Sequence, residues 1–544
     1  MDLETAPPPR TRAATWLPAL ALVALALATY ANALGNGFVW DDHRVVEPEE
    51  YAHLSTLRTV LTAPDILWKS DPAAYYRPLA RATYLVDRQL FGLDPRPYHL
   101  ENVLLHAAVA VLLFALARRL IGGTGPALAG AALFAAHPVC AEVVDFVTAR
   151  NNLLVAVSVL GSTLLYLRGR REGRRGPLVA GATVFFLGLL CKETAAMLLP
   201  FLGAWELVAP REPHRPREPL AARLAPLLPW VAAAAAYVAL RATILPSLVG
   251  TRPTTADVAA ALVRDLHIVP TYLRLLLFPA GLTVYHPEPG QYFSTVPALV
   301  AVWAAIAVGV GLLLRGRRPA TRFGLLWFAV NFLPVSTIIP MPSASIAERH
   351  LYIPALGLAL VVADQLAALV LRLARPRAVA AAVLVAVATL GTVTVARARD
   401  WHDDVALFSS ALRVNPGSSD ARFAYSLSLV ERGDVEGARR EWERIAATDP
   451  RHTGALSQLG TYHAERGRLA EAGAYFARVL ALDPRDVEAR FDMALLLERT
   501  GRPVEALAQY EAFLALNPVD YPELVPRVVE RVRRLRASLP PAAP

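Results

Sequence analysis

Residues 35–46 read GNGFVWDDHRVV, and the rest of the chain is organised around this stretch. An apolar run ends just before it, so Phe38 and Trp40 fall where a bilayer gives way to water. Two adjacent carboxylates, Asp41 and Asp42, follow directly. Burial disfavours their charge, and each acid raises the pKa of the other. Such a pair is either a functional site at a membrane surface or a pair of solvated loop residues. The remaining sequence distinguishes these alternatives.

The composition is typical of a multispanning membrane protein. Of the 544 residues, 55% are hydrophobic and only 19% are charged. The apolar residues come in runs of about 15 to 22, close to the length that crosses a bilayer. The first run, 13–34, is too long for a signal-peptide core, so we expect a retained helix. We expect about eleven spans, at residues 15–34, 100–117, 126–138, 151–167, 177–191, 194–209, 224–245, 295–314, 322–339, 351–371 and 377–396.

The arginines orient these spans. The net charge of +9 lies almost entirely in short loops between apolar runs, so it indicates membrane orientation and not a nucleic-acid partner. The loops that agree are those at Arg10 and Arg12, at Arg118 and Arg119, and at 168–175, 211–217, 315–322 and 372–377. We therefore expect a multi-pass protein of the inner (cytoplasmic) membrane, surrounded by membrane lipids, with a cytoplasmic N-terminus.

The opposite, periplasmic face receives most of the remaining polar segments. It holds the first loop, 35–98, and the long loop 246–294, within which 257–279 is apolar enough for an interfacial or re-entrant helix. The two cysteines, Cys140 and Cys191, offer at most one disulfide bond. The chain has no Walker loop, dinucleotide-binding GxGxxG, HExxH or CxxC motif, so soluble nucleotide or zinc chemistry has no support.

A repeat follows the last span. Prolines recur every 34 residues, as do glycines, alanines, one large aromatic position and one small position, which is the tetratricopeptide pattern. The aromatic position is Trp442, Phe476 and Tyr510, and the small one is Ser426, Gly460 and Ala494. We divide residues 398–518 into a partial repeat, 400–416, and full repeats 417–450, 451–484 and 485–518, with a capping helix and tail at 519–544. With an odd number of spans these repeats lie outside the cytoplasm, where they bind an extended protein or peptide acceptor or serve assembly.

Ionisable residues at membrane edges are functional candidates because lipid solvates them poorly. Those expected on the periplasmic face are Asp41, Asp42, Arg77, Arg81, His99, His106, His137, Glu142, Arg150, Lys192, Glu193, Glu348 and Arg349. Acids beside bases indicate a site that holds an anionic headgroup near a carboxylate base. Alternatives stay open: His106 can be a packing residue, His137 can end a helix, and Glu142, Arg150, Lys192 and Glu193 can form internal salt bridges.

Six motifs precede the repeats: FVWDDHRVV (38–46), YYRPLARATYLVD (75–87), YHLENVLLHA (98–107), HPVCAEVVDFVTARNNLL (137–154), CKETAAMLLP (191–200) and ERHLYIP (348–354). Together with the repeats they resemble those of one known family, the transmembrane and TPR repeat-containing proteins, which are O-mannosyltransferases of the GT-C fold. The resemblance implies a polyprenyl-phosphate sugar donor, an acceptor hydroxyl on protein, and an acidic active-site motif at Asp41 and Asp42. It also implies a donor-side role for Glu348 and Arg349. In the motif at 137–154, Cys140 stands where the family often has a polar residue, and the resemblance does not imply the identity of the sugar.

These observations together predict an all-α protein. A GT-C-like helical module, 1–397, would precede a tetratricopeptide solenoid. It would transfer a sugar from lipid phosphate to a hydroxyl, and the expected acceptors are Ser or Thr of exported protein. Asp42 or Asp41 would be the base, and Asp42 would hold any divalent cation, Mg²⁺ or Mn²⁺. The phosphate would contact Arg77, Arg150, Lys192 and Arg349, with His137, Glu142, Glu193 and Glu348 in support. Two rivals are a GT-C enzyme acting on glycan or lipid, and a non-catalytic membrane scaffold.

Overall fold

A computed structural model describes residues 13–64, 75–209, 219–245, 255–336, 346–516, 521 and 523–539. Within these ranges every regular element is a helix, so the predicted all-α class is confirmed. The chain divides into two compact units, one extending to Leu407 and the other beginning at Phe408. We call them the membrane module and the repeat unit. Arg10, Arg12 and the loop 211–217, which were used for orientation, lie outside the described residues, as does Pro518.

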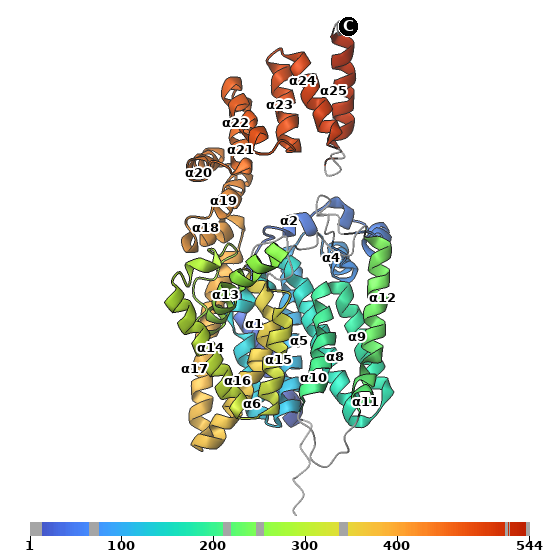
Figure 1. Ribbon diagram of the computed structural model, residues 1–544, viewed down its shortest axis with the longest axis vertical. Coiled ribbons are helices and arrows are strands. Elements are labelled where there is room, and N and C mark those ends of the chain that lie inside the picture. The colour runs from blue at the N-terminus through green and yellow to red at the C-terminus, as the bar shows by residue number, and fades with distance from the viewer. Residues whose placement is uncertain are drawn as a thin grey trace, which may run out of the picture. The chain divides into compact units, whose positions relative to one another are not determined.

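Each predicted span coincides with a helix of the membrane module (Figure 1). These helices are α1 (Ala13–Thr29), α5 (Pro95–Ile121), α6 (Thr124–Ala135), α8 (Arg150–Glu172), α9 (Arg175–Cys191), α10 (Leu198–Val208), α12 (Leu228–Ile244), α14 (Val296–Arg315), α15 (Pro319–Phe332), α16 (Tyr352–Leu373) and α17 (Pro376–Ala398). In the described part of the chain, six helical segments are long and apolar enough to cross a membrane, or seven if one bent pair counts. The expected number of eleven is not confirmed, because helices such as α10, with 11 residues, are short for a crossing of about 20.

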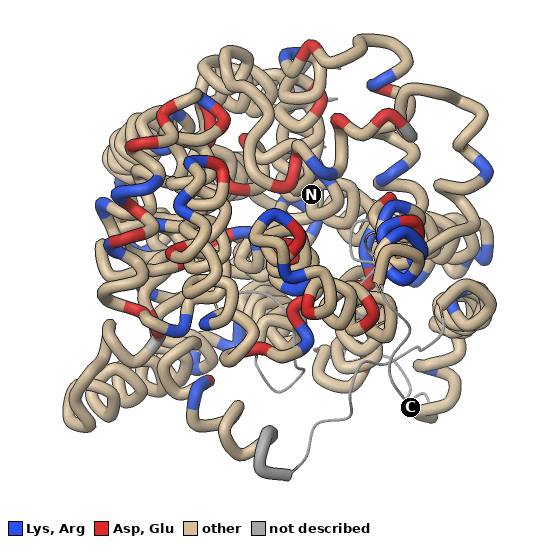
Figure 2. Tube along the Cα trace, turned by 90° about the horizontal axis from the view of Figure 1, so that it is seen from above, with Lys and Arg blue, Asp and Glu red and all other residues tan. Residues whose placement is uncertain are grey.

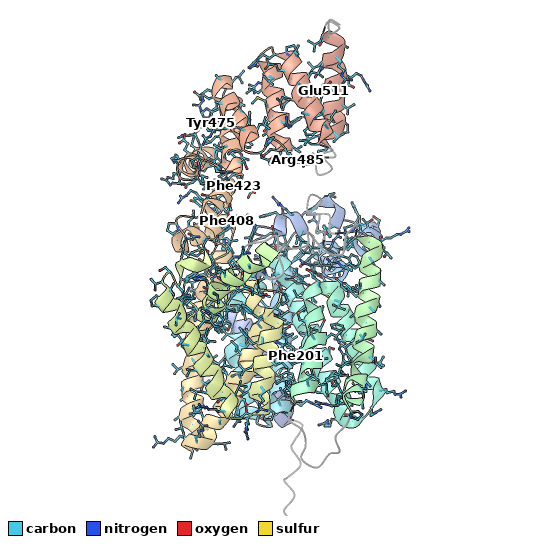
Figure 3. The ribbon with its side chains drawn as sticks, viewed as in Figure 1. Phe201, Phe408, Phe423, Tyr475, Arg485 and Glu511 are labelled. Carbon is cyan, nitrogen blue, oxygen red and sulfur yellow. The ribbon has the colours of Figure 1, made fainter. Side chains whose placement is uncertain are left out.

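The module is held together by aromatic contacts and by close helix approach. Phe201 of α10, which is labelled in Figure 3, meets Phe323 and Trp327 of α15 edge-on. The ring centroids are 4.9 and 5.0 Å apart. Where α15 crosses α16, a Cβ added to Gly324 would lie 2.4 Å from the carbonyl oxygen of Gly357. Only a residue without a side chain allows this approach, as is common where membrane helices cross.

The first loop, 35–98, is largely helical. It contains α2 (Asp42–Val45), α3 (Leu57–Thr62) and α4 (Pro78–Phe91), and α5 begins within it at Pro95. In Figure 1, α2 and α4 lie at one end of the bundle. The helix expected over 257–279 is present as α13 (Thr255–Leu277). The acidic loop therefore rests on the ends of the bundle helices.

The repeat unit contains the expected helix pairs. They are α19 (Ser419–Glu431) with α20 (Val435–Thr448), α21 (Thr453–Glu465) with α22 (Leu469–Leu482), and α23 (Val487–Arg499) with α24 (Pro503–Ala515). A partial repeat, α18 (Asp404–Val414), precedes them, and α25 (Leu524–Ser538) follows. The turn glycines Gly433, Gly467 and Gly501 have φ angles of 82°, 74° and 70°, a left-handed conformation that favours glycine.

Charges in the repeat unit are paired across helices. Figure 2 shows acidic and basic residues interspersed along the trace. The basic helix α25 is bound by acids of the last repeat, with Arg536 of α25 2.7 Å from Glu511 of α24 and Arg531 paired with Glu498 of α23. The capping helix thus neutralises its charge against the repeat that it covers.

The small position of the repeat faces the aromatic one, and this contact is testable. A Cβ at Gly460 would lie 2.6 Å from the ring of Phe476, which is buried. We expect Gly460→Ala to destabilise the repeat unit by about 1–3 kcal/mol through overpacking. Gly417→Ala, where no atom lies within 4 Å of the added carbon, is the control. Thermal unfolding of the full-length protein measures both, and equal stability of the two variants would contradict this packing.

Candidate functional site

The two acids of the first loop have different surroundings. Asp42 is fully buried, and its carboxylate oxygens accept the backbone N–H groups of Thr148, at 2.8 Å, and Val39, at 3.2 Å. Burial raises its pKa to about 7 although these bonds oppose the shift. The carboxylate of Asp41 is half-buried and makes no hydrogen bond within the described residues. Burial raises its pKa too, while the charge of Arg349 lowers it. Asp42 is therefore an anchor, and Asp41 is left available for chemistry.

The residue before the pair is strained. Trp40 has a φ angle of 55°, which is uncommon for a residue other than glycine. Its indole stacks on Phe146, with centroids 5.5 Å apart, and the guanidinium of Arg349 lies 5.6 Å from the indole. The indole of Trp40 therefore packs between Phe146 and the guanidinium of Arg349. Strained backbone of this kind occurs at functional sites, where the surrounding structure holds it.

Arg349 is fixed by a buried acid. Glu142, on α7 (Ala141–Asp145), accepts the Nη1 of Arg349 at 2.5 Å and the backbone N–H of the same residue at 2.9 Å. The glutamate is fully buried, whereas the arginine is partly exposed. The pair thus holds a cation at the edge of the module with its outer surface accessible.

Two further cations gather at the end of α9. Lys192 donates to Asn152 at 2.8 Å, and its pKa falls to about 7 because of burial and then because of the charge of Arg77, with a smaller effect of Arg349. Arg77 forms a forked pair with Glu193, at 2.6 and 3.2 Å. Although burial opposes it, this pair lowers the pKa of Glu193 to about 2. The electrostatic influence of Arg77 and Arg349 on Lys192 indicates that the three cations share one region.

Arg150, by contrast, is enclosed. Its side chain has no exposed surface and donates to Asp87 at 2.5 Å, Asn102 at 3.0 Å and the carbonyl of Tyr98 at 3.2 Å. A second acid, Glu101, lies 2.9 Å away. These contacts leave no face for a ligand, so we remove Arg150 from the proposed phosphate contacts. It is an internal salt-bridge partner, the alternative that the sequence left open.

The remaining candidates fasten segments together. Glu348 is buried and accepts the backbone N–H of Thr283 at 2.5 Å. His137 donates to the carbonyl of Leu276 at 3.0 Å and accepts the N–H of Val139, so it caps a helical turn. His106 contacts the hydroxyl of Tyr352 at 2.7 Å inside the bundle, as a packing residue does. Both ring nitrogens of His137 and His106 are thus occupied. The second carboxylate oxygen of Glu348 is buried, has no hydrogen bond within the described residues and lies 3.6 Å from Arg397.

The other predicted features have simple outcomes. Cys140 and Cys191 are both free and buried, so the optional disulfide does not form. Asp42 is poorly suited to a divalent cation, since both carboxylate oxygens already accept backbone N–H groups. Among the described residues, neither Asp41 nor Asp42 belongs to a cluster of three side chains able to ligate one metal ion.

Sequence reasoning missed Asp404 and Asn152. Asp404 was assigned to the partial repeat, yet it contacts Trp40 and His43 of the first loop. The one signal for it is a second Trp and acidic pair, WHDD at 401–404, which echoes WDD at 40–42. Asn152 accepts a hydrogen bond from Lys192, but nothing in the sequence distinguishes it from other asparagines near the start of a helix.

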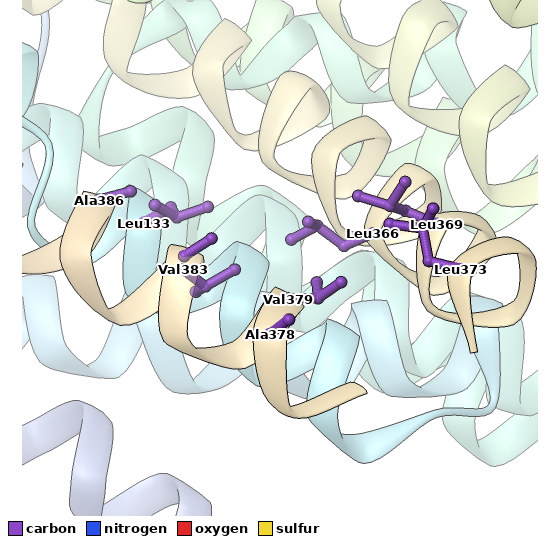
Figure 4. Close-up of a pocket in the computed structure, with 9 residues that line it drawn as sticks. Leu133, Leu366, Leu369, Leu373, Ala378, Val379, Val383 and Ala386 are labelled. Atoms are coloured by element: carbon purple, nitrogen blue, oxygen red, sulfur yellow. The ribbon is translucent and has the colours of Figure 1, made fainter. Parts of the chain in front are cut away.

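An apolar cavity in the described part of the chain lies elsewhere. Aliphatic residues of α6, α16 and α17 line about 400 Å³ (Figure 4). Leu369 and Leu373 line it near the end of α16 opposite to Arg349, roughly 30 Å away along the helix. With no polar residue in its lining, this cavity offers nothing to bind phosphate or accept a proton.

Residues 85–240 match the family model described as dolichyl-phosphate-mannose-protein mannosyltransferase, and residues 395–454 and 459–537 match tetratricopeptide models. The mouse protein O-mannosyl-transferase TMTC3 is 25% identical over 478 residues, which cover 81% of this chain and 52% of that protein. The human TMTC1 is also 25% identical, over 84% of this chain and 58% of its own length. The chain is thus similar to the transmembrane and TPR-containing, O-mannosyltransferase-like proteins over most of its length, as its motifs predicted.

Other matches cover a smaller part of this chain. Drosophila melanogaster Tmtc1 is 32% identical over 34% of this chain and 22% of its own length. The chain spans about half the length of the curated relatives TMTC3 and TMTC1. Among solved structures, YrrB, a TPR protein with an unusual peptide-binding site, aligns over 37% of this chain and 86% of its own at 22% identity, with a TM-score of 0.20 that supports no argument.

The assignment of Arg150 can be tested by stability. Arg150→Met leaves Asp87 buried without its partner, so we expect a loss of about 3–5 kcal/mol in the free energy of unfolding. Arg58→Met, at an exposed position, is the control and should leave stability unchanged. Thermal unfolding in detergent provides the measurement. If Arg150→Met were as stable as the control and lost only donor binding, Arg150 would belong to the phosphate site after all.

Proposed function

We propose that the membrane module transfers a sugar from a polyprenyl-phosphate donor to a Ser or Thr hydroxyl of a protein, with Asp41 as the general base. One observation supports the choice of Asp41 over Asp42. Both carboxylate oxygens of Asp42 accept backbone N–H groups, whereas the carboxylate of Asp41 makes no hydrogen bond within the described residues and interacts with the charge of Arg349. The family model and the names of the relatives support the reaction class.

The chemistry follows from these groups. The acceptor oxygen attacks the anomeric carbon, forming a new C–O bond while the bond from that carbon to the phosphate oxygen breaks. Asp41 takes the hydroxyl proton, and the lipid phosphate leaves with the bonding electron pair. Negative charge that develops on the leaving phosphate is stabilised by Arg349 and Lys192, with Arg77 nearby. Cations held in place before the reaction cost no reorganisation when it occurs.

The cations are held by different means, which suits different tasks. Arg349 is fixed by Glu142 on one side and lies over Trp40 on the other, so its planar guanidinium suits a fork to phosphate oxygens. Lys192 is a compact point charge held by one amide oxygen. A divalent cation, Mg²⁺ or Mn²⁺, stays a separate proposal that chelation would test, and no step above passes through it.

The donor and the acceptor would reach this site from different sides. The repeat unit would bind the protein acceptor in its groove, which raises the local acceptor concentration. The arginine pattern supports an inner-membrane location with the acidic loop and the repeats on the periplasmic side. The lipid-linked donor would then approach within the bilayer and the acceptor from the aqueous side.

The roles of the two acids can be separated. Asp41→Asn should keep the unfolding temperature and lower kcat for transfer by about 10²–10⁴, as expected for loss of a general base. Asp42→Asn places an amide N–H₂ against a backbone donor and should cost about 1–3 kcal/mol of stability. Transfer assays with purified protein and thermal unfolding measure the two effects. Normal transfer by Asp41→Asn, with inactive but stable Asp42→Asn, would exchange the roles.

Lys192 makes donor use dependent on pH. Its ammonium is charged below its pKa of about 7 and neutral above it, so kcat/KM for the donor should fall as the pH rises through that value. In Lys192→Arg the positive charge persists, and the fall should move to higher pH. Lys192→Met should have low kcat/KM throughout. A wild-type profile that is flat between pH 6 and 9 would show that Lys192 does not bind the phosphate.

A further inference from the structure

The first loop is fastened to the end of the last membrane helix by a series of hydrogen bonds. Side-chain amides of Asn32 and Asn36 donate to the carbonyls of Val395, at 3.1 Å, and Ala398, at 3.2 Å. Further on, the N–H of Gly37 donates to the carbonyl of His402 at 2.9 Å. Residues 32–43 and 395–404 thus run together although more than 350 positions separate them in the sequence. We call residues 395–404 the strap.

Asp404 ends the strap and contacts both sides of the acidic pair. One carboxylate oxygen accepts the backbone N–H of Trp40 at 2.8 Å, and the other accepts Nε2 of His43 at 2.8 Å. These residues immediately precede and follow Asp41 and Asp42. The side chain of Asp404 is only 13% exposed, so water competes poorly for these contacts. A single carboxylate therefore clamps the four-residue segment 40–43.

The Trp40 contact falls where the backbone needs support. Trp40 has the left-handed φ angle of 55°, which a residue with a side chain adopts only when its surroundings enforce it. The orientation of Trp40 determines how the chain enters Asp41. Asp404 holds the Trp40 amide, while Asp42 holds the amide of the preceding residue, Val39. Without Asp404 the buried anchor would remain, but the direction of Asp41 would be less restricted.

Asp404 is not needed for the helix in which it stands. Asp403 accepts the N–H of Ala406 at 2.9 Å and so caps the first turn of α18. Asp404 is the first residue of that helix, and its carboxylate is bound to the first loop instead. The neighbouring acids thus have separate tasks, which gives a matched pair for experiment.

We propose that Asp404 is a positioning residue for sugar transfer, which clamps Trp40 and His43 so that Asp41 is directed at the acceptor hydroxyl. This inference rests on the proposed function. It assigns Asp404, the last residue of WHDD at 401–404, to the support of the acidic loop of the membrane module, although the repeat pattern begins there.

The experiment compares Asp404→Ala, Asp404→Asn and Asp403→Ala in the full-length protein. Asp404→Ala removes both contacts, and we expect kcat to fall about 10- to 100-fold, with KM for a polyprenyl-phosphate hexose within about twofold of wild type. Asp404→Asn keeps an oxygen for the Trp40 amide and should retain more activity. Asp403→Ala should keep near-normal kcat. Hydrogen exchange of peptides covering 38–46 should be faster in Asp404→Ala than in wild type or Asp403→Ala.

Each outcome decides the matter. An unchanged kcat in Asp404→Ala, an equal loss in Asp403→Ala, or unchanged exchange over 38–46 would overturn the positioning role. If Asp404→Ala does not fold, Asp404→Asn carries the test: a kcat loss with faster exchange supports the role, and wild-type values of both oppose it. The proposed function fails separately, when Asp41→Asn transfers sugar normally. In that case Asp404→Ala would still alter exchange over 38–46, showing a clamp that serves another task.

Discussion

A buried carboxylate must find hydrogen-bond donors, and Asp42 finds them in the backbone of Val39 and Thr148. The first donor belongs to its own loop and the second to the turn before α8, so the bond joins the first loop to the helix bundle. With Asp42 turned inward, its neighbour Asp41 stays at the half-buried surface. Two chemically identical residues thus differ in burial and in hydrogen bonding because of the direction in which each side chain is held.

The cations around this loop follow the same logic. Each is fixed by a neutral or acidic partner of its own: Arg349 by Glu142, Arg77 by Glu193, and Lys192 by Asn152. The pairs come from segments that lie far apart in sequence and meet at the ends of membrane helices. A positive region built in advance is what the departure of a lipid phosphate requires. Arg150 shows the contrast, because its N–H groups are turned toward protein and none remains for a ligand.

Much of the fold could be predicted because periodicity reports packing directly. A small position and an aromatic position, such as Gly460 and Phe476, each recur every 34 residues because the two helices of a repeat cross where these residues meet. The span count could not be predicted as well, because an apolar run shows burial but not whether its helix, such as the 14-residue α15, is long enough to cross.

The sequence predicted the acidic motif and Arg349 as site residues, but it could not show that Asp41 and Asp42, or Arg150 and Arg349, have different surroundings. Those differences depend on which backbone donors and acids lie nearby in space. Asp404 was out of reach for the same reason, since its partners Trp40 and His43 lie more than 350 residues away in the chain.

The central claim is that this constellation transfers a sugar from lipid phosphate to protein hydroxyls. The most direct measurement is intact-mass spectrometry of membrane and exported proteins from cells with and without this protein. The account predicts that specific Ser- or Thr-linked hexose masses disappear when the protein is absent, while the unmodified proteins persist. Identical glycan masses in both samples, with the protein expressed and folded, would contradict it.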